Sequence, residues 1–327
     1  MKIAELRKLL ENTNEDLLKK TIVEVYKLVP SAKKSDADNI IADVLNGNTT
    51  KKVKKDNGTS FAELSDEINT FLENVYEQNY FVPNRAVPKK DRPKWRFLVK
   101  RYVKELDKIT LDNEHYDEAC NLLVKLYAMM CHACNYYLFA TRDPFQSVGI
   151  EQFAFYSLVV NKVLSKSYCE NNITTLLILA ATSGLSMNSL SSDQESYLIS
   201  SLDKSDYLYM AVKIAKEKIV ELKEKLKALP QYSNNRYFIE NDINNYCDFI
   251  LMAEIKLQEY DDAIAYYFNN SEDFDKEVTL YKALDIVDWF AEDDKLWLEY
   301  YNYGLKKKIK PRDQLKDEYK QKAKNKK

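Results

Sequence analysis

The sequence predicts an all-α protein, built as an irregular α-solenoid of antiparallel helical pairs behind a small N-terminal helical module. Three observations support this fold class. Only 5 of the 327 residues are glycine and 7 are proline, whereas average usage would give roughly four to five times as many glycines. Apolar residues recur three and four positions apart along most of the chain, which is the period of an amphipathic helix. Short alternating stretches such as residues 26–29 lie inside better helical registers, so no strand is expected.

Residues 1–46 are expected to form a three-helix module. Two apolar stripes at helical spacing precede Pro30, and Gly47 is placed to end a third helix. The following segment, residues 48–59, contains a single apolar side chain. Such a polar stretch between helical patterns is typical of a connection, so residues 47–59 are predicted to be a polar linker.

The next region, residues 60–184, is predicted to be helical. Ser60 and Glu63 have the spacing of a capping box, which favours a helix start. A loop with three prolines follows, and around it lies a strongly basic segment, residues 85–104, with nine basic residues and one acidic residue. A serine-rich stretch near residue 184 marks a second boundary.

Residues 185–305 are predicted to form an acidic, repeat-like helical region. Apolar positions between residues 208 and 229 alternate steps of four and three, which favours one arm of a long helical hairpin or a short coiled coil. Between Glu240 and Tyr303 there are seventeen acidic and four basic residues. Residues 306–327 reverse this balance, with eleven basic and three acidic residues, and are expected to be a lysine-rich tail.

Two segments, residues 253–267 and 116–123, contain the sequence Tyr-Asp-Asp-Ala or Tyr-Asp-Glu-Ala where a helix is expected to begin. A small residue allows two helices to approach closely, and an aromatic ring fills the groove beside it. The segments resemble the junction between the two helices of a tetratricopeptide repeat. The resemblance implies antiparallel helix pairs that bind a protein or peptide on a concave face. The residues expected to pack at this junction are Ala253, Tyr260, Ala263 and Tyr267.

The sharpest candidate site is the helix expected between Pro93 and Ile109. Its apolar residues gather on one arc, while basic residues step along the opposite side around one aromatic residue. Basic side chains around an exposed aromatic ring suit phosphate neutralisation combined with base stacking. The candidate polyanion-binding residues on this face are Lys94, Arg96, Phe97, Lys100, Arg101 and Lys104.

Three interpretations of this basic face remain open. It can be a solvated face that pairs with the acidic residues of the 240–303 segment, with Phe97 covered by the preceding loop. It can bind a polyanion, to which the lysines of residues 51–55 and 306–327 would add affinity. It can also contact a membrane surface. Arginine is scarce in the chain, which argues against extensive bidentate reading of bases.

A second candidate is the Cys131-His-Ala-Cys134 motif, whose spacing is typical of zinc or redox sites. The motif lies in the middle of an expected helix, and the chain has no second CxxC pair. Two cysteines on one helix face supply two ligands at most. The alternative is that Cys131 and Cys134 are small buried residues.

Little in the sequence points to catalysis. The chain has two histidines, His115 and His132, and lacks a phosphate-binding loop, a dinucleotide-binding fingerprint and an HExxH motif. No cofactor is implied.

The longest apolar run, residues 176–181, is far too short to span a bilayer. The first residues lack the apolar core of a signal peptide, so a cytoplasmic location is expected.

The sequence therefore favours a non-enzymatic scaffold that binds another protein or peptide, through its acidic C-terminal half. Nucleic-acid binding through residues 85–104 and the C-terminal tail is the first alternative. A metal- or carboxylate-dependent enzyme is the second.

Overall fold

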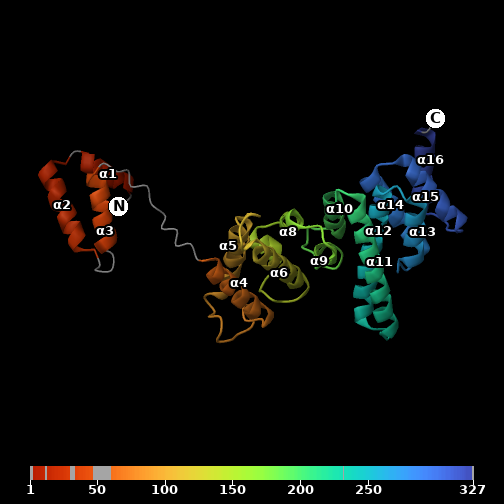
Figure 1. Ribbon diagram of the computed structural model, residues 1–327, viewed down its shortest axis with the longest axis horizontal. Coiled ribbons are helices and arrows are strands. Elements are labelled where there is room, and N and C mark those ends of the chain that lie inside the picture. The colour runs from red at the N-terminus through yellow and green to blue at the C-terminus, as the bar shows by residue number, and fades with distance from the viewer. Residues whose placement is uncertain (1–2, 12, 30–33, 47–59, 231, 326–327) are drawn as a thin grey trace. The chain divides into compact units, whose positions relative to one another are not determined.

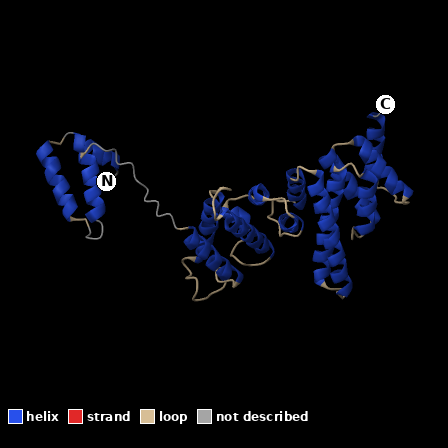
Figure 2. Cartoon of the chain, viewed as in Figure 1, coloured by secondary structure: helices blue, strands red, loops and turns tan. Residues whose placement is uncertain are grey.

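The computed structural model describes residues 3–11, 13–29, 34–46, 60–230 and 232–325 (Figure 1). Helices account for all the regular structure within these ranges, and no strand occurs there (Figure 2). The expected all-α fold is therefore confirmed. The chain divides into two compact units, Met1–Ser60 and Phe61–Lys327. The linker predicted at residues 47–59 and the lysines of residues 51–55 lie outside the described residues.

The N-terminal unit contains α1 (Ile3–Glu11), α2 (Glu15–Lys27) and α3 (Lys34–Leu45). Asn14 caps α2, because its side-chain oxygen accepts hydrogen bonds from the backbone N–H groups of Asp16 (2.8 Å) and Leu17 (3.3 Å). No described side chain of α2 is buried. This unit therefore leaves apolar surface exposed.

The second unit begins with a group of helices that positions the basic segment. Helix α5 enters through a 3₁₀ turn at Arg92–Lys94, where Pro93 occupies a first-turn position. It packs against α6 and α7, and α6 in turn packs against α4 and α8. The elements are α4 (Phe61–Tyr76), α5 (Trp95–Asp107), α6 (Tyr116–Asn135), α7 (Pro144–Val148), α8 (Gln152–Lys166) and α9 (Glu170–Ala181).

A helix lies inside the serine-rich stretch that we expected to be a boundary. Helix α10 (Ser191–Ser201) buries Gln194, Leu198 and Ile199 against α8, α9 and α12. Its serines lie at other, more accessible positions of the helix, where they mask the helical periodicity. Because α10 contacts helices on both sides of residue 185, residues 61–327 form one unit rather than two.

Two long helices, α11 (Ser205–Ala228) and α12 (Asn234–Lys256), lie side by side as the expected hairpin (Figure 1). Helix α13 (Tyr260–Asn270) packs against α12. Ala253 and Ala263 are fully buried, and the buried Tyr267 donates a hydrogen bond to Oδ1 of Asp248 (2.6 Å). Tyr260 is half-buried, and its carbonyl accepts a hydrogen bond from Tyr300 (3.0 Å).

The last helices close the array. They are α14 (Lys276–Ile286), a π-helical turn (Val287–Ala291), α15 (Asp294–Lys306) and α16 (Asp313–Asn325). Gly304 of α15 allows a close approach to α14, since a Cβ atom there would lie 2.6 Å from a methyl carbon of Leu280. Helix α16 corrects the expectation of a tail at residues 306–327. Its Leu315 is buried, and the ring of Tyr319 stacks on Tyr301 of α15.

Candidate nucleic-acid interface

Helix α5 has one buried face and one exposed face. Val99, Tyr102 and Leu106 are buried against neighbouring helices, which leaves the cationic residues turned outward, as the sequence predicts. Phe97 lies among them with 62% of its surface exposed. The guanidinium of Arg96 lies 5.0 Å from the centroid of the Phe97 ring, within the range of a cation–π contact. The preceding loop therefore does not cover Phe97.

The six candidate residues divide into paired and unpaired groups. Lys94 forms an ion pair with Asp91 (2.6 Å), and Arg101 forms one with Glu67 of α4. Among the described residues, the side chains of Arg96, Lys100 and Lys104 have no carboxylate within ion-pair distance. These three exposed cations are spaced four residues apart and lie on one face of the helix.

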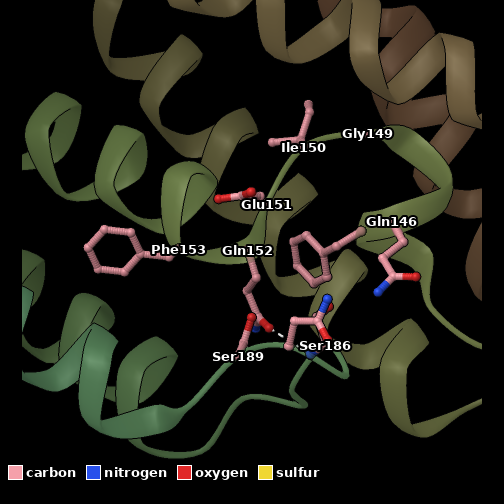
Figure 3. Close-up of a pocket in the computed structure, with 10 residues that line it drawn as sticks. Gln146, Gly149, Ile150, Glu151, Gln152, Phe153, Ser186 and Ser189 are labelled. Atoms are coloured by element: carbon pink, nitrogen blue, oxygen red, sulfur yellow. Dashed lines mark hydrogen bonds between the residues drawn. The ribbon is translucent and has the colours of Figure 1, made fainter.

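A pocket of about 400 Å³, lined by both polar and apolar side chains, lies near this face at the turn between α7 and α8 (Figure 3). Gly149 lines the pocket with a left-handed backbone (φ 71°), and the ammonium of Lys100 lies 3.6 Å from the position a Cβ atom would take there. Figure 3 shows Gln152 pointing toward Ser186 and Ser189 on the opposite wall. Lys100 of α5 thus lies beside the rim of this pocket.

Hydrogen bonds hold the wall of this pocket in place. Buried Asp143 accepts them from Ser186 Oγ (2.7 Å), the Met187 N–H (3.0 Å) and the Gln146 N–H (3.1 Å). Burial opposes the charged form of Asp143, but these donors keep its pKa below the usual value. Gln152 is also buried, and its Oε1 accepts a hydrogen bond from the Ser186 N–H (2.7 Å). The serine-rich loop is therefore fixed rather than free.

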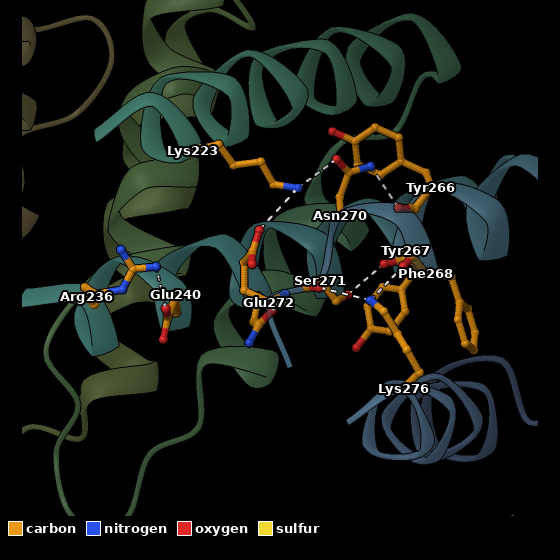
Figure 4. Close-up of polar contacts among 11 residues, drawn as sticks. Lys223, Arg236, Glu240, Tyr266, Tyr267, Phe268, Asn270, Ser271, Glu272 and Lys276 are labelled. Carbon is orange, nitrogen blue, oxygen red and sulfur yellow. Dashed lines mark hydrogen bonds and ion pairs between the residues drawn. The ribbon is translucent and has the colours of Figure 1, made fainter. Parts of the chain in front are cut away.

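The acidic half of the chain neutralises many of its carboxylates with its own cations. Figure 4 shows two of these contacts, Lys223 with Glu272 (3.4 Å) and Arg236 with Glu240 (3.4 Å). None of the ion pairs among the described residues joins α5 to the 240–303 segment. The described residues therefore do not show the pairing of the basic face with the acidic segment that the first interpretation requires. Further ion pairs of carboxylates in this half include Lys216–Glu254, Lys282–Asp273, Arg312–Glu277, Lys295–Glu299, and Lys322 with both Asp288 and Asp294.

The proline-rich loop before α5 is held by side chains that bond to its backbone. Asn84 donates to the carbonyls of Asn79 (2.6 Å) and Val82 (2.7 Å). Arg92 donates from Nε to the Val87 carbonyl (3.2 Å) and from Nη2 to the Asn84 carbonyl (3.3 Å). The exposed cationic side chains of this loop, which are Arg85, Lys89 and Lys90, therefore extend from a defined backbone.

Sequence reasoning missed a set of exposed aromatic residues next to this loop. They lie at the C-terminal ends of α4 and α6, and the tyrosine pair that follows Asn135 is the signal that could have found them. A helix that ends in two large rings after a buried, apolar stretch exposes those rings unless another element covers them. The residues are Tyr76, Phe81, His132, Tyr136 and Tyr137.

The CxxC cysteines do not form a metal centre with other described residues. No group of three or more His, Cys, Asp or Glu side chains in the described ranges is arranged to hold a metal ion. Cys131 is buried and Cys134 is half-buried. Burial raises the pKa of Cys131 to about 11 and that of Cys134 to about 12, so both are neutral thiols at pH 7.

Comparison with protein-family models, curated proteins and solved structures gives no match to this chain. Within the described ranges, none of the helices combines the length and the apolar composition needed to cross a bilayer.

Proposed function

We propose that the protein binds nucleic acid, with the exposed face of α5 holding phosphate groups. One observation carries the proposal. Within the described ranges, Arg96, Lys100 and Lys104 are exposed and have no carboxylate partner, and Arg96 contacts the exposed ring of Phe97 on the same side of the helix. Unneutralised cations in a row attract a polyanion and release its counterions on binding. The low share of arginine favours binding without strong sequence preference.

Charge reversal tests this function. The variant Arg96→Glu, Lys100→Glu, Lys104→Glu is compared with the wild type by fluorescence anisotropy of a labelled oligonucleotide over a range of salt concentrations. Each lost phosphate contact lowers the slope of log K against log salt by about 0.7 for a single strand, so we expect the slope to fall by about 2. The affinity at low salt should fall about tenfold or more.

A matched control keeps the change in net charge constant. The variant Lys213→Glu, Lys225→Glu, Lys227→Glu places the same three reversals on exposed positions of α11. This control should bind more tightly than the α5 variant. Equal losses in the two variants, or a flat salt response of the wild type, would contradict the proposal.

A second candidate function is the binding of a protein or peptide, and the N-terminal unit favours it. Leu17 and Val25 of α2, and Leu28 directly after it, are each more than half exposed and lie on one open face of this helix. Apolar side chains along one helix suit an amphipathic partner helix. Replacing Leu17 and Val25 with serine should release a protein that co-purifies in high salt. Retention of that protein by the double variant would count against this surface.

A further inference from the structure

Exposed aromatic rings are stacked in and beside the loop between α4 and α5 (residues 77–91), which carries Arg85, Lys89 and Lys90 and is called the basic loop below. The rings of Phe81 and Tyr137 are nearly parallel, with an interplanar angle of 16° and centroids 5.7 Å apart. They come from segments 56 positions apart in the sequence, yet both remain accessible, with exposed fractions of 39% and 69%. Large exposed rings in a cluster indicate an interaction surface rather than core.

A second stack adjoins the first through neighbouring residues of the chain. The ring of Tyr136 lies on His132, with centroids 4.3 Å apart and an angle of 26°. Tyr76 of α4 approaches the same histidine, at 5.9 Å between centroids. Burial lowers the pKa of His132, so its ring is neutral at pH 7 and stacks without a charge of its own. We call these five residues, Tyr76, Phe81, His132, Tyr136 and Tyr137, the aromatic cluster.

Two contacts join the segment that carries Tyr136 and Tyr137 to the basic loop and to the first turn of α5. Gln78 Nε2 donates a hydrogen bond to the Tyr137 carbonyl (3.1 Å), which ties the basic loop to the end of α6. Two residues beyond Tyr137, the ring of Phe139 stacks on Trp95 at the start of α5 (3.8 Å between centroids). Two residues of chain span at most about 7 Å. The segment that carries Tyr136 and Tyr137 therefore packs against the first turn of α5, where Arg96 follows Trp95 in the chain.

We propose that the aromatic cluster stacks the bases of single-stranded nucleic acid, while the α5 cations and the basic loop hold its phosphates. This proposal rests on the proposed function and adds the class of nucleic acid. Every base has a π-face, so aromatic platforms beside a cationic surface bind single strands with little sequence preference. A duplex conceals the faces of its bases and would use the cations alone. Within the described ranges the α5 cations Arg96, Lys100 and Lys104 have no carboxylate partner, and together with the exposed rings they make a polyanion with free bases the complementary occupant.

Anisotropy with a labelled strand of about 15 nucleotides, a length in the range such surfaces cover, and with its duplex tests the proposal. The wild type should bind the single strand about tenfold or more tightly than the duplex. Phe81→Ala and Tyr137→Ala should each weaken single-strand binding about fivefold or more and change duplex binding less than about twofold. Tyr137→Phe keeps the ring and should keep the affinity. Tyr232→Ala, at an exposed ring elsewhere, should have no effect.

A second measurement reports stacking directly. A strand that contains 2-aminopurine should lose fluorescence on binding the wild type, and Tyr137→Ala should lessen that quenching at saturating protein. As a control for folding, each variant should have the same melting temperature as the wild type in a thermal unfolding experiment.

The outcomes separate the two proposals. Equal affinity for single strand and duplex, with no effect of the alanine variants, overturns the stacking role and leaves the α5 face intact. Absence of binding to either oligonucleotide overturns both proposals. Binding to vesicles that contain anionic lipid, in the absence of oligonucleotide binding, assigns the surface to a membrane instead and overturns both as well.

Discussion

Trp95 lies flat against Phe139, with ring planes 11° apart and centroids 3.8 Å apart. The two residues belong to different parts of the chain, the first turn of α5 and the segment that follows α6. Their stack joins the helix that carries the exposed cations to the segment that carries Tyr136 and Tyr137. This buried aromatic contact therefore holds the segment with the proposed base-stacking tyrosines against the first turn of the proposed phosphate-binding helix.

Because Phe139 is buried in this contact and Phe97 is exposed, we expect the two rings to contribute differently to the free energy of unfolding. Phe139→Ala should lower the free energy of unfolding by about 3–5 kcal/mol, because it removes a buried ring and leaves a cavity. Phe97→Ala should change it by less than about 0.5 kcal/mol, since this ring is mostly exposed. Urea unfolding followed by tryptophan fluorescence reports on this unit, because all three tryptophans lie within residues 61–327. Similar losses for the two variants would contradict the assigned burial.

Asp248 predicts a pH dependence of stability. Burial raises its pKa to about 6, and the hydrogen bond from Tyr267 and the charge of Lys282 offset this only in part. The unfolded value is about 3.9, so between these values the folded protein holds the proton more tightly than the unfolded chain does. The stability from this group is fully present below about pH 4 and is lost as the pH rises through about 6.

Asp248→Asn removes this titration and keeps an oxygen that can accept the Tyr267 hydrogen bond. We compare the change in the free energy of unfolding between pH 4.5 and pH 7.5 in the two proteins. Over this range the wild type should lose more stability than the variant does, by on the order of 1–3 kcal/mol. Urea unfolding at the two pH values measures this difference. Asp261→Asn, at an exposed position of α13, is the control and should leave the pH dependence of the wild type in place. An unchanged pH dependence in Asp248→Asn would show that the carboxyl is ordinarily solvated.

Helix α16 predicts that the lysine-rich C-terminal segment contributes to stability. Leu315→Ala should cost about 2–5 kcal/mol, because Leu315 is buried. Lys320→Ala, at an exposed position on the same helix, should cost less than about 0.5 kcal/mol. Lys322 lies 5.4 Å from the Trp297 ring, so tryptophan fluorescence during urea unfolding detects the release of this helix. Wild-type stability in Leu315→Ala would mean that residues 313–325 behave as the free tail expected from composition.

The cysteines predict a simple reactivity order. Cys169 is exposed, whereas Cys131 and Cys247 are buried thiols whose pKa values burial raises. A thiol reagent at pH 8 should therefore modify Cys169 first in the folded protein and reach the two buried thiols only after unfolding. Mass spectrometry of timed samples locates the label, and Cys169→Ser should remove the fast phase. Rapid labelling of Cys131 in the native state would contradict its position inside α6.

The sequence by itself determined the fold class and the buried face of α5. Helical periodicity is a local property, because residues three and four positions apart share one side of a helix wherever that helix packs. The row of Arg96, Lys100 and Lys104 could therefore be placed on a single face before any contact was known. The same local signal failed for α10, since its serines hide an apolar face that only α8, α9 and α12 reveal.

The tertiary structure decided which charges and rings remain free. An ion pair depends on which helices meet, so sequence left open whether the α5 cations pair with the acidic half or stay available. The acidic half instead pairs with its own lysines and with α16, through contacts such as Lys322 with Asp288. The aromatic cluster likewise joins Phe81 to Tyr137 across 56 positions of sequence. Such long-range pairings arise only when packing brings distant segments together, and no local pattern encodes them.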